Sequence, residues 1–197
     1  MTVFIMVKRL FFPWLFVSAA VSFSYSAGIM FQKERVDAVI RAPDMLEIRG
    51  TYWFVNKDTL PSSAALFYPF PIDSFSAYPH YLSVARLPDK KPLRFDTFSN
   101  GIRWPITLAV KGCDSIRVVY RQRVKRMQGR YIITTAKVWG RALSSAEFSV
   151  TVPPGMVLDY WSFIADTTFL RNDTLVYRYR RAPFSPEADM LLRWRNK

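Results

Sequence analysis

Hydrophobic and polar positions alternate with a period of two through much of this chain. Between residues 46 and 54 the apolar set is Leu46, Ile48, Tyr52 and Phe54 with the small Gly50, and the set between them is Glu47, Arg49 and Thr51. A period of two is typical of a strand with one buried face. A second alternation places Ile116, Val118, Tyr120 and Val124 on one face of a long strand. Both segments are therefore predicted to be strands of a half-buried sheet.

Shorter apolar segments separated by turn residues continue this style. The predicted strands are 64–70, 78–87, 93–98, 102–110, 131–138, 148–152, 156–164, 168–170, 175–179 and 190–194. A turn at Met127–Gly129 predicts a hairpin between the strand ending near Lys125 and the segment 131–138, and 142–146 is read as a single helical turn. About ten to twelve short strands predict an all-β fold, an antiparallel β-sandwich.

The N-terminal segment predicts export. Lys8 and Arg9 precede an uncharged, mostly apolar run from Leu10 to about Phe31. A positive start, an apolar centre and small residues near its end are the pattern of a signal peptide at 1–26, cleaved after Ser26. The run is also long enough for an uncleaved membrane anchor reaching to about residue 31. The remaining segment, 27–197, is predicted to be one domain in the periplasm or at the cell surface.

The residue inventory argues against several kinds of chemistry. Cys113 is the only cysteine and His80 the only histidine, so a disulfide and the usual zinc sites are not expected. The seven glycines form no nucleotide-binding motif. We therefore expect no cofactor, no metal and no catalytic residue. The alternative, an envelope hydrolase, would need two facing carboxylates, for which Glu47 and Asp159 lie within predicted strands.

A strongly basic charge suggests acidic partners. The full chain carries +13, and removing the two basic residues of 1–26 leaves 26 basic against 15 acidic residues, or +11. Outside the cytosol such a charge favours anionic lipids, anionic glycans and acidic proteins, and a membrane surface is a further partner to consider. No nucleic acid partner is expected. The sequence does not predict the oligomeric state.

One strand concentrates this charge. Arg117, Arg121, Arg123 and Lys125 share a face by the period of two, and Arg126 and Arg130 follow at the next turn. Arginine pairs with phosphate and carboxylate through its planar guanidinium group, so these six residues are the candidate anion-binding site. The alternative is a solvated sheet face whose charges protect strand edges.

Two segments carry a family resemblance. Gly50–Asn56, an aromatic strand ending in Asn, and Leu66–Pro71, an apolar strand ending in a Phe-Pro turn, resemble the start of vault/inter-alpha-trypsin-type β domains. The chain is also similar to uncharacterised exported bacterial all-β proteins, which share segments like 131–154 and 175–184. The resemblance implies an extracytoplasmic β-sandwich used for interaction and brings no catalytic residues.

The sequence thus predicts a non-enzymatic cell-envelope β-sandwich that binds a protein or an envelope polymer. A binding module for anionic glycan or lipid, using the arginine-rich sheet face, is the first alternative. The envelope hydrolase is the second.

Overall fold

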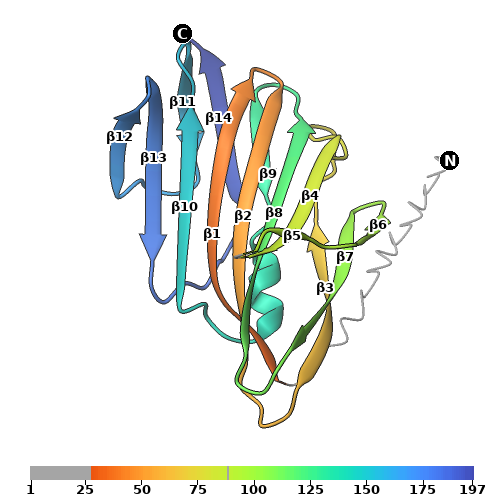
Figure 1. The fold of residues 1–197 in the computed structure, drawn as a ribbon. Coiled ribbons are helices and arrows are strands. Elements are labelled where there is room, and N and C mark those ends of the chain that lie inside the picture. The colour runs from red at the N-terminus through yellow and green to blue at the C-terminus, as the bar shows by residue number, and fades with distance from the viewer. Residues whose placement is uncertain (1–27, 88) are drawn as a thin grey trace, which may run out of the picture.

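The computed structural model describes residues 28–87 and 89–197, which form an all-β fold of 14 strands in three sheets (Figure 1). The strands are β1 (Ile29–Ala42), β2 (Met45–Asn56), β3 (Ser62–Pro69), β4 (Tyr81–Leu87), β5 (Lys91–Pro92), β6 (Asp96–Phe98), β7 (Gly101–Leu108), β8 (Cys113–Arg123), β9 (Gln128–Tyr131), β10 (Ser145–Val152), β11 (Met156–Trp161), β12 (Thr167–Arg171), β13 (Thr174–Arg181) and β14 (Met190–Asn196). A 3₁₀ helix, η1 (Thr134–Trp139), is the one helical element in these residues. The predicted all-β sandwich is confirmed.

The sheets form two layers. The large sheet has the order β12-β13-β10-β1-β2-β8-β4-β5, and the small sheets have the orders β11-β14-β9 and β3-β7-β6. In Figure 1 the large sheet faces the viewer, with β9 and β14 behind it and β3 and β7 at its lower right. Neighbouring strands are antiparallel except for β1 and β10, which pair in parallel from Lys33 opposite Ser145 to Val39 opposite Thr151.

The core lies between these layers and is rich in aromatic residues. Phe70 and Tyr120 bring β8 into contact with the segment after β3, with ring centroids 5.0 Å apart. Phe148 of β10 is fully buried and contacts Phe184 in the segment before β14. Gly129 of β9 lies so close to Leu46 of β2 that an added Cβ would stand 2.5 Å from Leu46 Cδ2. These contacts cover the inner face of the central strands of the large sheet, whereas its edge strands β12 and β5 are largely exposed.

Three predictions about local structure are wrong. The chain from 131 to 138 is not a strand, because β9 ends at Tyr131 and η1 follows. The expected hairpin does not form, since β9 pairs with β14 rather than with β8. Residues 142–146 are not a helical turn: Leu143 bridges to Phe184 and β10 begins at Ser145. In each case a partner distant in the sequence decides the pairing.

The strand β1 was not predicted at all. Its first residues, Ile29 and Phe31, close the apolar run that suggested an anchor reaching to about residue 31, and both are buried in the core of the sandwich. The predicted signal peptide, 1–26, lies outside the described residues. Within 28–87 and 89–197, no helix has the length and apolar character needed to cross a membrane.

Candidate functional site

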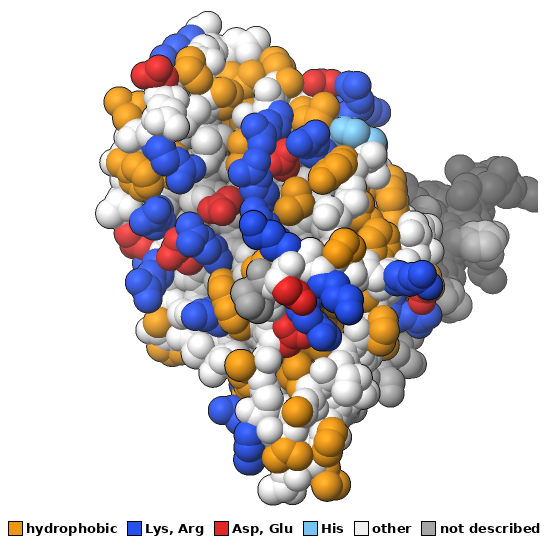
Figure 2. All heavy atoms as spheres, in the orientation of Figure 1, with side chains coloured by type: hydrophobic (Ala, Val, Ile, Leu, Met, Phe, Trp, Pro, Cys, Tyr) orange, Lys and Arg blue, Asp and Glu red, His pale blue; other side chains and the backbone are white. Residues whose placement is uncertain are grey.

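The outer face of the large sheet gathers basic side chains from three adjacent strands. These outward-pointing residues are referred to below as the arginine face. They are Lys33, Arg35 and Arg41 of β1, Arg49 of β2, and Arg117, Arg121 and Arg123 of β8. Four carboxylates lie among them: Asp37, Asp44, Glu47 and Glu147. Glu147 lies on the neighbouring β10 and is shared with Arg178 of β13, so seven basic groups of β1, β2 and β8 stand against Asp37, Asp44 and Glu47. Figure 2 shows Lys and Arg side chains running down the middle of this face with few carboxylates between them.

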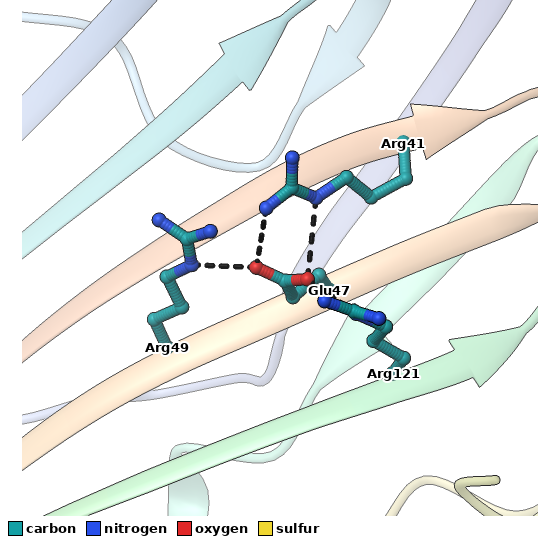
Figure 3. A network of polar contacts seen from close by, with 4 residues as sticks. All are labelled: Arg41, Glu47, Arg49 and Arg121. Atoms are coloured by element: carbon teal, nitrogen blue, oxygen red, sulfur yellow. Dashed lines mark hydrogen bonds and ion pairs between the residues drawn. The ribbon is translucent and has the colours of Figure 1, made fainter. Parts of the chain in front are cut away.

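Glu47 organises the centre of the arginine face (Figure 3). Its carboxylate accepts hydrogen bonds from Arg41 Nη2 at 2.7 Å, Arg41 Nε at 3.2 Å and Arg121 Nε at 2.6 Å. Arg49 Nε donates to the same carboxylate at 2.5 Å. The Glu47 side chain is only 1% exposed, whereas the three arginine side chains are 38–45% exposed. A single buried carboxylate therefore holds three exposed guanidinium groups together.

The register of the sheet explains why these residues meet. Glu47 of β2 stands opposite Arg121 of β8, and Arg49 is two residues further along β2 on the same face. Arg41 reaches them from the end of β1, just where the β1–β2 register shifts between Ile40 and Ala42. Sequence separation hides this arrangement, because Glu47 and Arg121 are 74 residues apart.

Electrostatics keep Glu47 ionised. Burial raises the pKa of its carboxyl group, but the hydrogen bonds from Arg41, Arg121 and Arg49 and the charge of Arg49 outweigh burial and lower that pKa from 4.5 to about 2. At neutral pH the cluster is thus one negative charge beneath three positive charges. Its net charge of about +2 faces solvent, where it is available to an anionic ligand.

Further contacts fix the neighbouring basic residues. The Arg121 guanidinium lies over the Tyr81 ring, 4.8 Å from its centroid. Arg123 pairs with Asp44 at 2.6 Å, and Arg35 with Glu147 at 3.5 Å. Arg117 stands opposite Thr51 and Ala85 in the adjacent strands, and no ion pair to it is found in the described part of the chain. Among the described residues, Arg117 is therefore the one arginine of the face without a carboxylate partner.

The six residues predicted to bind anions fall into two groups. Arg117, Arg121 and Arg123 lie on the arginine face, as the period of two predicted. Lys125 and Arg126 lie beyond the end of β8, where positive φ angles at Arg126 and Met127 turn the chain toward β9. Arg130 of β9 belongs to a different sheet and pairs with Asp73 at 3.1 Å. The six therefore do not form one continuous patch.

The sequence interpretation missed three members of the cluster. Arg41 lies in the unpredicted strand β1, and Arg49 and Glu47 were recognised only as polar positions of their strand. Glu47 was considered as half of a catalytic pair with Asp159, but Asp159 accepts a hydrogen bond from Arg195 in the sheet of β11 and β14. The two carboxylates thus belong to separate ion pairs in separate sheets. His80 is exposed and lies just before β4 rather than within a strand.

Comparisons with known proteins show similarity in fold only. No protein-family model and no curated protein sequence matches the chain. A Legionella pneumophila protein described as a "putative nutrient binding protein" superimposes with a TM-score of 0.62 at 14% identity, covering 85% of this chain and 67% of that chain. An M1 zinc metallopeptidase of Deinococcus radiodurans, bound to a peptide substrate, gives a TM-score of 0.54 at 13% identity, covering 84% of this chain.

These identities are too low to transfer a function, and the chain spans 42% of the peptidase it resembles. Neither neighbour is a vault/inter-alpha-trypsin-type domain, so that resemblance stays a prediction. The class that the fold defines is a two-layer β-sandwich with a basic outer face. No group of three or more potential metal ligands occurs in residues 28–87 and 89–197.

Proposed function

We propose that this chain is a non-enzymatic binding module of the cell envelope whose arginine face holds an anionic polymer. The observation that carries the proposal is the buried Glu47, which fixes three exposed arginines in one cluster with excess positive charge. A sheet face that only needed solubility would not require a buried carboxylate to align its arginines. An envelope protein is the other partner that the sequence predicts.

The geometry of the cluster suits phosphate, sulfate or carboxylate groups. Arg49 and Arg121 each contact Glu47 through Nε alone, which leaves their terminal N–H groups for another acceptor. Planar guanidinium groups bind such anions through paired, charge-assisted hydrogen bonds. Because the side chains come from rigid neighbouring strands, little conformational entropy is lost when a ligand binds.

Two further considerations support a binding role. The carboxylates weighed for hydrolysis, Glu47 and Asp159, are each engaged by arginine, which favours binding over catalysis. The Legionella neighbour is described as a "putative nutrient binding protein", which is in keeping with a binding role for this fold. Export to the envelope rests on the N-terminal segment of the sequence.

The test compares a polyanion with its uncharged counterpart. Dextran sulfate should bind the protein, and neutral dextran of the same length should not. Binding should weaken steeply between about 0.05 and 0.5 M salt, because exposed charges are screened over roughly 4–14 Å in that range. Equal retention of both polymers would refute an anion-binding function.

A matched pair of variants separates the arginine face from the overall charge. Arg117→Glu on the face and Arg193→Glu on β14 change the net charge equally. We expect Arg117→Glu to weaken dextran sulfate binding by about tenfold, equivalent to about 1.4 kcal/mol, and Arg193→Glu to weaken it far less. If the two variants weaken binding equally, the attraction is a property of net charge and the assigned site is wrong.

A further inference from the structure

A small cavity lies on the opposite side of the large sheet from the arginine face. It is enclosed by the inner face of β1 and β2, by β3 and by η1, and its volume is about 70 Å³. Its exposed rim residues, Ala65 of β3 and Val138 of η1, place the opening between these two elements. The cavity is therefore independent of the site proposed above.

The buried Glu34 of β1 is the acidic group of this cavity. The residue is 3% exposed, and its Oε1 atom has no hydrogen-bond partner among the described residues. Its carboxyl group interacts with the Tyr131 hydroxyl, which is hydrogen-bonded at 2.8 Å to the Tyr52 hydroxyl. Tyr52 in turn shares a 2.9 Å hydrogen bond with Tyr68. A buried carboxyl oxygen without a partner is costly, so it marks a position where a ligand could donate a hydrogen bond.

Half of the other residues that line the cavity are aromatic. Trp139 of η1 packs against Phe31 and Phe54, with ring centroids 6.0 and 5.9 Å away. Phe67, Trp104 and three tyrosines supply the other aromatic side chains of the lining: Tyr52, Tyr68 and Tyr131. No Lys or Arg is among the described residues that line the cavity. Aromatic faces attract cations, and the attraction grows when water is excluded.

We propose that this cavity binds the ammonium head of a small organic amine, with the Glu34 carboxylate as its counter-ion and the surrounding rings facing the cation. An anion would meet a carboxyl group and no basic side chain. A wholly apolar ligand would leave Glu34 Oε1 unpaired. An alkylammonium ion can donate a hydrogen bond to Glu34 Oε1, and its positive charge is attracted to the aromatic rings of the wall.

The volume limits the size of the ligand. A cavity of about 150 Å³ accommodates benzene, so 70 Å³ suits a group of about three non-hydrogen atoms. Ethylammonium has this size and carries one positive charge. From three non-hydrogen atoms we expect an affinity in the millimolar range.

The protonation state of Glu34 links binding to pH. Burial raises the pKa of the Glu34 carboxyl group to about 8, although the hydrogen bond from Tyr131 opposes the shift. The titratable groups that face it are Tyr52, Tyr68 and Tyr131, whose pKa values burial also raises, so they stay neutral between pH 6 and 9. Lys137 of η1 donates instead to the Glu187 carbonyl. An amine would therefore displace the Glu34 proton.

The experiment titrates the protein with ethylammonium chloride and follows its tryptophan fluorescence. Two of the six tryptophans, Trp104 and Trp139, line the cavity and should respond to a bound ligand. Ethanol and acetate serve as neutral and anionic probes of similar size, and sodium chloride keeps the ionic strength constant. We expect saturable binding of ethylammonium only. Equal binding of ethanol, or no saturable response to ethylammonium at pH 9, would overturn the proposal. The wild-type protein alone is sufficient for this test.

Two further arms assign the site. Glu34→Gln, which keeps the shape of the side chain, should weaken ethylammonium binding at pH 9 by more than tenfold, whereas Glu147→Gln on the outer face should leave it unchanged. In the wild type the affinity should rise about tenfold per pH unit from pH 6 to 8 and then level off. A flat pH profile, or unchanged binding by Glu34→Gln, would show that Glu34 is not the counter-ion.

Discussion

Replacing Glu34 by Gln should stabilise the protein, and the gain should grow with pH. In the folded chain the carboxyl group is 3% exposed and its pKa is about 8, whereas in the unfolded chain it returns to its ordinary value of 4.5. Below pH 4.5 both states carry the proton, so the contribution that this group makes to stability is fully present. Between pH 4.5 and 8 the unfolded state ionises and the folded state does not, so this contribution is progressively lost. Glutamine has no proton to lose.

The expected magnitude follows from the two pKa values. Each unit of difference corresponds to about 1.36 kcal/mol, so the two and a half units between pH 4.5 and 7 give roughly 3.4 kcal/mol. The difference in unfolding free energy between Glu34→Gln and wild type should therefore rise by about 1.4 kcal/mol per pH unit and level off above pH 8. Other titrating groups contribute equally to both proteins and cancel in this difference.

Urea denaturation of both proteins at pH 5, 6, 7 and 8 measures the effect. The slope of the difference decides the matter, because a constant offset at all pH values would report only the packing of the new amide. A slope near zero would refute the reasoning, since it would mean that Glu34 ionises with an ordinary pKa in the folded protein. Tyr131→Phe removes the hydroxyl that favours the ionised form of Glu34. Above pH 7 the unfolding free energy of this variant should therefore fall more steeply with pH than that of the wild type.

Three other perturbations test the packing and the arginine cluster. Glu47→Gln should lower the free energy of unfolding by about 1–3 kcal/mol at pH 7. Because the pKa of Glu47 is lowered to about 2, the wild type should lose this contribution as the pH falls from 4.5 to 2. Acid titration followed by circular dichroism measures this, and unfolding of both proteins at the same pH would refute it. Phe148→Ala should cost about 3–5 kcal/mol in urea denaturation, because the ring is fully buried, and a cost below 1 kcal/mol would contradict its place in the core. Gly129→Ala should lower the free energy of unfolding by about 1–3 kcal/mol, because the new Cβ would collide with Leu46. In the double variant with Leu46→Ala the loss should be smaller than the sum of the two single losses. Additive losses would show that Leu46 is not the group in the way.

The period of two predicted those strands whose buried face is apolar. In β8 the inward Ile116, Val118 and Tyr120 and the outward Arg117 and Arg121 follow the expected pattern. The same rule predicted Arg117, Arg121, Arg123 and Lys125 on one face. The three arginines lie there, but the prediction for Lys125 is wrong, because β8 ends at Arg123. Alternation is a local property, so a single sequence is sufficient to detect it.

The pattern failed where polar residues are buried or where pairing is distant. In β1 the inward Glu34 interrupts the alternation, and the preceding Ile29 and Phe31 merge with the N-terminal apolar run. Glu47 is polar yet buried, which makes sense only beside Arg41, Arg49 and Arg121. Such positions are determined by tertiary contacts, and the cavity around Glu34 likewise requires residues from β1, β2, β3 and η1 together.

The parallel pairing of β1 with β10 has a consequence for the order of folding. β1 occupies the middle of the large sheet, yet Asp37 and its partner Ser149 are 112 residues apart in the chain. Pairings of such high contact order form late, because the entropy of closing a long loop is lost before any contact compensates for it. The β1–β2 hairpin can form early, but one edge of β1 must wait until the chain has been completed beyond Val152. Until then that edge is unpaired and can pair with another copy, so slow arrival of β10 would favour association over the native sandwich.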